Sequence, residues 1–519
     1  MKKAIYLIIA LIGLSAPSCS DSMLDFSPTD SGSGKELLKS ASTAITSVNG
    51  VYRSMWTAGW STTANTHQCF GIAAYNLALD CMADDLIMQS QGNGWFWGDH
   101  CYNVKSNYTS SAFRSYDVWY ANYKWIANVN YIIDAEPEMA GTEADVAYVA
   151  GQAYAIRALC YLNLATWFSR APYNSLTGAS RWNEPCVPVY TTGTSIDTGG
   201  QPRESLRTVY GRIDQDIDRA IELLEKARET TLAENNKSHI NLYVALGIKS
   251  RACLAEGDWD GAFKAAKRVI DEGGYAVGTK SDLTGGMNSL DKQNVMWGAG
   301  IQVADQAGGY TGFFTHMDNK EGAYAKSAPK LISKQLYNRI SATDIRRDWW
   351  DPSDKESPYV SKKFSFANVA SFLGDYIYMR VEEMYFTAAE AALRLDDLKS
   401  ARELMNTVMA ERDPGYSANN RSGTLLGATT TTWTGSFLEN ILTHRRIELW
   451  GEYGRLFDVR RLGQGIDRRT DDGFSEECIS MMNRRNVNIT KADTYDWVLT
   501  IPKAELDANP NINEEDQNP

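Results

Sequence analysis

Residues 445–463 read RRIELWGEYGRLFDVRRLG, with five arginines and three carboxylates set among large apolar side chains. Guanidinium groups pair with carboxylates through two parallel hydrogen bonds, which suits them to holding segments of a fold together. The density of charges at helical spacing therefore predicts a structural network of ion pairs rather than a catalytic site.

A second stretch of the same kind lies upstream and reads YMRVEEMYFTAAEA at residues 378–391. Arg380, Glu383 and Glu390 recur at helical spacing beside an apolar face. We assign these charges to the fold as well.

Helical periodicity dominates the rest of the chain. Apolar side chains at helical spacing predict helices over residues 44–56, 116–133, 147–168, 206–227, 241–256, 259–271, 378–394, 398–410 and 437–453.

Two of these helix pairs resemble each other. Residues 245–266 and 385–401 both carry runs of alanine around a short turn with aspartate, Gly-Asp in one pair and Asp-Asp in the other. Small residues let two antiparallel helices approach closely, and such hairpins bury their faces by stacking, as in tetratricopeptide repeats. The predicted fold class is therefore mainly α, a tetratricopeptide-repeat scaffold with long ordered loops and a few short strands.

Long irregular segments separate the helices and are rich in glycine, polar residues and aromatic residues. They cover residues 89–113, 174–201, 273–375 and 418–433. Loops of this length are functional or disordered, and their tryptophan and tyrosine content favours order. We expect one domain over residues 35–519, with a helical part over about 35–272, a loop-rich insertion over about 273–375 and a second helical part over about 376–519.

The first residues predict export. Met1-Lys2-Lys3 precedes an apolar run that ends at Leu14 and is too short to span a bilayer. Leu14-Ser-Ala-Pro-Ser-Cys19 is similar to a bacterial lipobox, although Pro17 is unusual there. We expect a lipoprotein signal peptide over 1–18, lipidation at Cys19 and a flexible tether over 19–34, with plain secretion as the alternative.

Composition excludes several classes of protein. The 519 residues are 43% hydrophobic and 22% charged, as in a globular chain. Lysine and arginine number 52 against 64 aspartates and glutamates, a net charge of −12. Nucleic-acid binding needs a basic footprint, so we expect no nucleic-acid partner.

Four stretches in order resemble the SusD/RagB family of outer-membrane nutrient-binding lipoproteins. Besides residues 378–391 and 445–463, they are AIRALCYLNLATWFSRAP at 155–172 and IPKAELDANPN at 501–511. With the lipobox-like start, the resemblance spans nearly the whole chain.

The resemblance implies a function. Members of this family are lipid-anchored on the cell surface, capture a glycan or in some branches a peptide, and deliver it to a SusC-like TonB-dependent transporter. They are not enzymes, and their ligand site is a shallow aromatic surface built on loops. It implies a protein that binds an oligosaccharide or polysaccharide and needs no cofactor.

The loop at residues 89–102, QSQGNGWFWGDHCY, is the first candidate for that surface. Its crowded aromatic side chains lie between glycines, and in an extended chain Trp95 and Trp97 would face the same side. The alternative is that one or both tryptophans fix the loop to the scaffold. The candidate ligand-binding residues of this loop are Asn93, Trp95, Trp97, Asp99 and Tyr102.

A second candidate lies within residues 302–314, where Tyr310 and Phe313 stand among glycines. Aromatic residues elsewhere in the long insertion fit packing better. Trp297 lies in a segment similar to a family core strand, and Trp349-Trp350 follows a turn similar to one in the family.

Catalytic and metal signatures are weak. The sequence contains no Gly-x-Ser-x-Gly, phosphate-loop, His-Glu-x-x-His or dinucleotide motif. The spacing of His67, Cys69, Cys81, His100 and Cys101 lacks the short paired loops of zinc sites. We expect no catalytic residue and no metal.

Three other functions stay open at this point. The same lipoprotein could capture peptides, as in the RagB branch. A secreted glycoside hydrolase would need two suitably spaced carboxylates, and so acidic a chain has many carboxylates to supply them. A helical scaffold that binds only a protein partner is the third.

Overall fold

The structure is a computed structural model, and it describes residues 34–57, 65–103, 109, 111–195, 197–233, 237–302, 311–429, 432–492 and 494–519. The expected signal peptide, Cys19 and nearly all of the tether lie outside these residues. Among the described residues, no helix has the length and apolar character needed to cross a bilayer.

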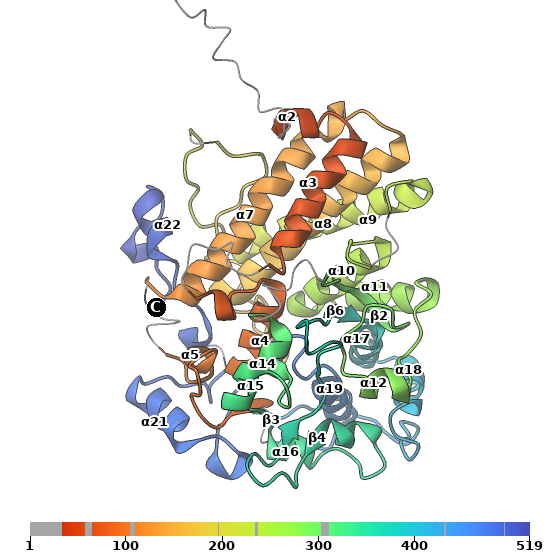
Figure 1. Cartoon of the computed structure of the whole chain (residues 1–519), viewed down its shortest axis with the longest axis vertical. Helices are drawn as coiled ribbons and strands as arrows, with labels where there is room; N and C mark the ends of the chain where they lie inside the picture. The colour runs from red at the N-terminus through yellow and green to blue at the C-terminus, as the bar shows by residue number, and fades with distance from the viewer. Residues whose placement is uncertain are drawn as a thin grey trace, which may run out of the picture.

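Helices make up most of the described chain, and the strands are few and short (Figure 1). This confirms the predicted fold class. The longer helices are α3 (Ala41–Ser54), α4 (Ile72–Met82), α7 (Phe113–Ala135), α8 (Glu143–Phe168), α9 (Leu206–Lys226), α10 (Leu242–Glu256), α11 (Trp259–Glu272), α17 (Val381–Arg394), α18 (Leu398–Ala410) and α19 (Phe437–Glu448).

The remaining α-helices are shorter. They are α2 (Gly34–Leu37), α5 (Trp97–His100), α12 (Lys280–Thr284), α14 (Phe313–Met317), α15 (Ala323–Ser327), α16 (Lys334–Tyr337), α20 (Arg455–Arg461), α21 (Glu476–Arg484) and α22 (Lys503–Ala508).

Two small antiparallel sheets complete the fold. The first has the strand order β1-β3-β5-β4, from β1 (Leu86–Met88), β3 (Lys330–Ile332), β5 (Val360–Ser361) and β4 (Trp350–Asp351). The second pairs β2 (Val295–Ala299) with β6 (Tyr376–Arg380), with Val295 opposite Arg380 and Ala299 opposite Tyr376. Trp297, Trp349 and Trp350 are buried, as predicted.

Helix α8 lies at the centre of the N-terminal bundle, where it packs against α7 and α9 (Figure 1). The Thr142 side chain caps its first turn by accepting a hydrogen bond from the Asp145 N–H at 3.1 Å. Its apolar side chains point in all directions because the helix is covered on several sides.

The predicted helix hairpins are present. In α10–α11 the chain turns at Gly257, whose φ of 78° lies in the left-handed region, and Asp258 caps the second helix. In α17–α18 the turn uses Asp396, with φ of 62°, and the cap is Asp397. Helix α11 also packs against α17, so the two hairpins stack as repeats do.

The two charged stretches meet in the core. Glu448, from the stretch at 445–463, accepts hydrogen bonds from Arg380 at 2.9 Å, Arg412 at 2.9 Å and Arg346 at 3.0 Å. Burial alone would raise the pKa of Glu448, but the surrounding guanidinium groups, Arg412 first, hold this pKa well below its usual range. The structural interpretation of these charges is confirmed.

Several helix boundaries differ from the expectation, and α19 ends at Glu448 rather than at residue 453. The residues from Tyr376 to Arg380 form strand β6, and α17 begins only at Val381. The alternation of Tyr376 and Tyr378 follows a strand period that the adjoining helical pattern conceals.

Candidate functional site

The loop at residues 89–102 is not extended. Phe96 has a φ of 61°, and the chain then enters the one-turn helix α5. This turn breaks the alternation that would have placed Trp95 and Trp97 on the same side, and Trp97 goes into the core with 3% of its surface exposed.

Two polar candidates of this loop are also held inside. The Asp99 carboxylate accepts hydrogen bonds from Arg114 at 3.0 and 2.8 Å, and both side chains are fully buried. The Tyr102 hydroxyl donates to the Met82 carbonyl at 2.5 Å. These contacts fix the loop to α4 and α7.

Trp95 and Asn93 remain near the surface. Asn93 is exposed, whereas Trp95 is half-buried and stacks on the His67 ring, with centroids 4.8 Å apart. Tyr324 approaches the edge of Trp95 at 6.1 Å, and its hydroxyl lies 2.5 Å from His67 Nδ1. We call Trp95, His67 and Tyr324 the Trp95 cluster.

The second predicted segment is only partly described. Tyr310 lies outside the described residues. Phe313 begins α14 and is buried, with its ring against Phe314, Phe364 and Tyr376.

Four of the predicted ligand-binding side chains thus belong to the packed interior in this structure. They are Trp97, Asp99, Tyr102 and Phe313. The expectation that they form an exposed binding surface is corrected, because each is buried against protein groups; ligand contact by Trp95 and Asn93 stays a prediction.

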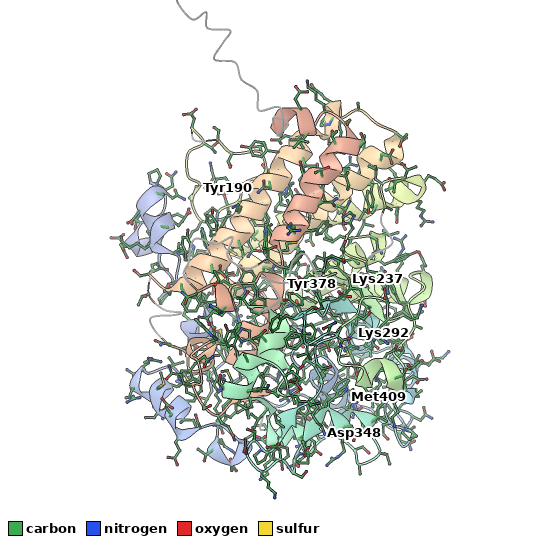
Figure 2. All side chains as sticks on the ribbon, viewed as in Figure 1. Tyr190, Lys237, Lys292, Asp348, Tyr378 and Met409 are labelled. Atoms are coloured by element: carbon green, nitrogen blue, oxygen red, sulfur yellow. The ribbon has the colours of Figure 1, made fainter. Side chains whose placement is uncertain are left out.

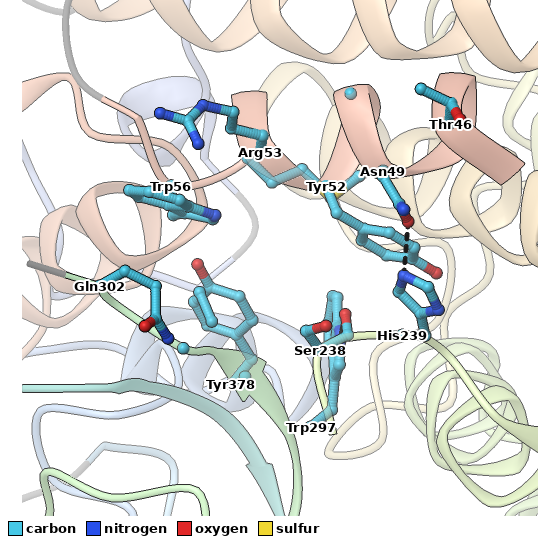
Figure 3. Close-up of a pocket in the computed structure, with 15 residues that line it drawn as sticks. Thr46, Asn49, Tyr52, Arg53, Trp56, Ser238, His239, Trp297, Gln302 and Tyr378 are labelled. Atoms are coloured by element: carbon cyan, nitrogen blue, oxygen red, sulfur yellow. Dashed lines mark hydrogen bonds between the residues drawn. The ribbon is translucent and has the colours of Figure 1, made fainter. Parts of the chain in front are cut away.

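A cavity of about 470 Å³ lies between the end of α3 and the β2–β6 sheet (Figure 3). Helix α3 and the residues just after it supply one wall, and the strands with the segment at Ser238 and His239 supply the other. Its lining includes Asn49, Tyr52, Arg53, Trp56, Ser238, His239, Trp297, Gln302 and Tyr378. We call it the Trp56 cavity.

The back of this cavity is rigidly built. His239 Nε2 lies 2.7 Å from the Asn49 side-chain oxygen, and its ring stacks on Tyr52 at 5.0 Å (Figure 3). The Trp297 indole donates to the Ser238 carbonyl at 3.0 Å. These groups already have partners, so they shape the wall and leave ligand contacts to other side chains.

The mouth of the cavity carries the more adaptable groups. Trp56 is half-buried, and the Arg53 guanidinium lies 5.5 Å from its ring centroid. The Tyr378 ring packs edge-on against Trp297 at 5.0 Å, and its hydroxyl points toward the Trp56 side (Figure 3).

The Tyr378 hydroxyl is buried and has no hydrogen-bond partner among the described residues. Burial raises the pKa of this phenol well above its usual value, so it stays protonated and can donate. Leaving a buried hydroxyl unsatisfied costs free energy. A ligand oxygen in the cavity would satisfy it.

The described part of the lining contains no aspartate or glutamate. The lining can interact with a ligand by ring stacking on Trp56 and by hydrogen bonds from Tyr378, Arg53 and Gln302. Such a set binds and orients a ligand that has both apolar faces and hydroxyl groups. It supplies no carboxylate pair for general acid–base catalysis.

The cavity and the Trp95 cluster are joined through the core. Tyr376 and Tyr378 stand two residues apart on β6, so their side chains share a face. From Tyr376 a series of ring contacts leads to Tyr324 and Trp95 through Phe70 and His316, with centroid distances between 4.9 and 6.4 Å.

Sequence reasoning missed the Trp56 cavity. The sequence pattern places Trp56 and Arg53 on one helix and Tyr378 at the start of another. The usable signal was the tyrosine alternation at 376–378, which indicates a strand, combined with a tryptophan at a helix end before a stretch rich in Gly, Ser and Thr.

Comparison with known protein families gives two matches. A family model described as the SusD family matches residues 330–519, and one described as starch-binding associating with outer membrane matches residues 43–254. No curated protein sequence matches the chain.

Similar solved structures cover almost the whole chain. A SusD-like carbohydrate binding protein from Bacteroides vulgatus is 25% identical, with a TM-score of 0.73, over 92% of this chain and 98% of that one. A SusD superfamily protein from Bacteroides thetaiotaomicron is 22% identical, with a TM-score of 0.72, over 92% of this chain and 100% of that one.

A third structure was determined with a ligand. Surface glycan-binding protein A from Bacteroides thetaiotaomicron, in complex with laminarihexaose, is 16% identical, with a TM-score of 0.62, over 92% of this chain and 99% of that one. At this identity the likeness concerns the fold alone.

Proposed function

The chain belongs to the SusD family, and from this premise we propose that it captures an oligosaccharide in the Trp56 cavity. The observation that carries the proposal is the Tyr378 hydroxyl, buried without a described partner beside the Trp56 ring. A sugar ring offers C–H groups to an aromatic face and hydroxyls to polar neighbours. The Trp56 cavity provides both an aromatic face and polar side chains.

The Trp95 cluster extends the same binding surface. The Trp95 indole N–H is buried without a described hydrogen-bond partner, and Asn93 adds an exposed amide beside it. The ring contacts from Tyr376 to Trp95 connect the two places through the core. A chain of several sugar units would lie across the cavity and the cluster together.

In this proposal, the captured oligosaccharide is then taken up by the cell. The protein is held on the outer membrane through acylated Cys19 and passes its ligand to a SusC-like TonB-dependent transporter. Support for this part comes from the lipobox-like start, and from the family model whose description names association with the outer membrane.

The protein binds the glycan and does not cleave it. The described lining of the Trp56 cavity has aromatic, amide, hydroxyl and guanidinium groups and no carboxylate, which supports capture without hydrolysis.

Calorimetry on a soluble form of the chain, starting at Ser20, tests the proposal. The probes are a panel of hexasaccharides and polysaccharides of plant, host and microbial origin, and the mixtures are analysed afterwards for shortened products. We expect one glycan to bind with a Kd on the order of micromolar to millimolar and to remain intact. Binding of a peptide panel instead, or release of shortened sugars, overturns the proposal.

A further inference from the structure

A second cavity of about 470 Å³ lies on a different side of the N-terminal bundle. It is formed by α7, by Glu505 of α22, and by Tyr190, Thr194, Ser195 and Thr198. Figure 2 labels Tyr190 beside the upper part of α7, whereas Tyr378 of the Trp56 cavity lies near the centre of the molecule. We call this second cavity the Trp119 cavity.

One face of α7 provides the aromatic wall. Trp119, Tyr120 and Tyr123 follow at helical spacing and all line the cavity. Trp119 and Tyr123 contact each other at 4.9 Å, and Tyr190 meets Tyr123 edge-on at 5.9 Å.

These rings are held in place by hydrogen bonds on their far sides. The Tyr123 hydroxyl donates to the Pro188 carbonyl at 2.7 Å. The Tyr190 hydroxyl accepts from the Gln201 N–H at 3.0 Å. The wall therefore exists before any ligand arrives, which lowers the entropic cost of binding.

Polar groups surround this wall. Glu505 of α22 accepts a hydrogen bond from the Trp119 indole at 3.3 Å and one from the Asn509 amide at 2.7 Å. Thr194, Ser195 and Thr198, whose side chains carry hydroxyl groups, also line the cavity.

The charges of the lining balance. Lys124, which lies 5.5 Å from the Tyr120 ring centroid, supplies the only cation among the described lining residues, and Glu505 supplies the only carboxylate there. A cavity with aromatic faces, hydroxyl groups and no net charge suits a neutral ligand with apolar faces and many hydroxyls.

We propose that the Trp119 cavity is a second saccharide-binding site, which takes one or two neutral sugar units of a glycan. This inference rests on the proposed function for the nature of the ligand, but it uses a separate set of residues. Two sites on one protein would hold a long polysaccharide more tightly than a short fragment, because the second contact becomes intramolecular.

Fluorine NMR of protein labelled with 5-fluorotryptophan observes both sites in one sample. Trp56→Phe and Trp119→Phe variants assign the two signals. The probes are laminarihexaose, maltohexaose, xylohexaose and mannohexaose, each added to millimolar concentration. We expect a hexasaccharide that shifts the Trp56 signal to shift the Trp119 signal as well.

Variants separate the two sites. Tyr120→Ala removes an aromatic face from the Trp119 cavity, and we expect it to abolish the shift of Trp119 and to leave the shift of Trp56 unchanged. Tyr116→Ala is the matched control: Tyr116 lies one turn earlier and stacks on Tyr120 at 5.5 Å without lining the cavity. It should retain both shifts.

Each outcome decides between the claims. A shift of Trp56 alone overturns the second site and leaves the proposed function intact. A shift of Trp119 alone supports the second site and contradicts the role of the Trp56 cavity. If none of the four probes shifts either signal, both claims are overturned. A shift of the Trp119 signal that persists in Tyr120→Ala overturns the second site.

Discussion

Arg461 and Glu390 form a two-pronged ion pair across 71 residues of sequence, with Nη1–Oε1 at 2.9 Å and Nη2–Oε2 at 2.7 Å. Both side chains are buried. The pair joins α20 to α17, so the two charged stretches that characterise the sequence are each other's partners in space.

Removing one member of this pair should destabilise the protein strongly. Glu390→Ala leaves the Arg461 guanidinium buried with only part of its charge compensated, and we expect the free energy of unfolding to fall by about 3–5 kcal/mol. Urea unfolding followed by circular dichroism measures the change. Glu403→Ala, in the exposed pair with Lys399 on α18, is the control and should leave the midpoint unchanged. Equal effects of the two variants would contradict a structural role for the buried pair.

Acid should weaken the fold through the same network. Burial alone would raise the pKa of Glu390, but Arg461 and Arg394 lower it below its ordinary value, and Arg445 and Arg461 likewise lower the pKa of Asp458. Carboxylates with a lowered folded-state pKa stabilise the protein above the unfolded value of about 4, and this stabilisation is lost as pH falls through the folded value. We expect the melting temperature to drop steeply below about pH 4. Glu390→Gln should have a lower melting temperature at pH 7 and a shallower drop of the melting temperature in acid. If the melting temperature of this variant falls with pH as steeply as that of the wild type, Glu390 does not cause the acid sensitivity.

The sequence predicts the helical scaffold well because its signals are local. Helix α18 begins and ends where the periodicity places it, and Leu206 starts α9 as expected. The role of Arg380 and Glu448 as fold residues also follows from sequence, since dense Arg–Glu patterns suit ion pairs.

The binding site depends on features that a sequence does not display. Trp97 was expected beside Trp95, but the positive φ of Phe96 rotates it into the core. The Trp56 cavity joins α3 to strands more than 200 residues away, and no local pattern indicates that Trp56 and Tyr378 share a wall. The loop was recognisable from sequence, and the direction of each side chain was not.

Tyr378→Phe should affect stability and binding in opposite directions. Its hydroxyl is buried without a described partner, so its removal should raise the free energy of unfolding by about 1–3 kcal/mol. Loss of a hydrogen bond to the ligand should weaken glycan binding about 3- to 10-fold. Tyr376→Phe is the matched change on the same strand. Its hydroxyl accepts from the Phe313 N–H at 3.2 Å, so this variant should lose stability. A Tyr378→Phe protein that binds as tightly as wild type would remove this hydroxyl from the site.

Trp95 and Trp97 should behave differently although they are two residues apart. Trp97→Ala empties a core position and should lower the free energy of unfolding by about 3–5 kcal/mol. Trp95→Ala should change stability less and should weaken glycan binding about 10-fold, because it removes the aromatic face at the surface. Denaturant unfolding and calorimetry on both variants make the comparison. An unchanged affinity in Trp95→Ala would confine the site to the Trp56 cavity.

The most direct test of the account is the calorimetric affinity of Trp56→Ala for the hexasaccharide that the wild-type protein binds. The Trp56 ring is the aromatic anchor of the cavity, and truncating such an anchor costs about 2 kcal/mol or more, so we predict an affinity at least about 30-fold weaker. Trp182→Ala, which removes a half-buried tryptophan outside the cavity, is the control and should bind as wild type. If Trp56→Ala, folded by circular dichroism, keeps the wild-type affinity, the ligand does not bind in the Trp56 cavity and the account is wrong.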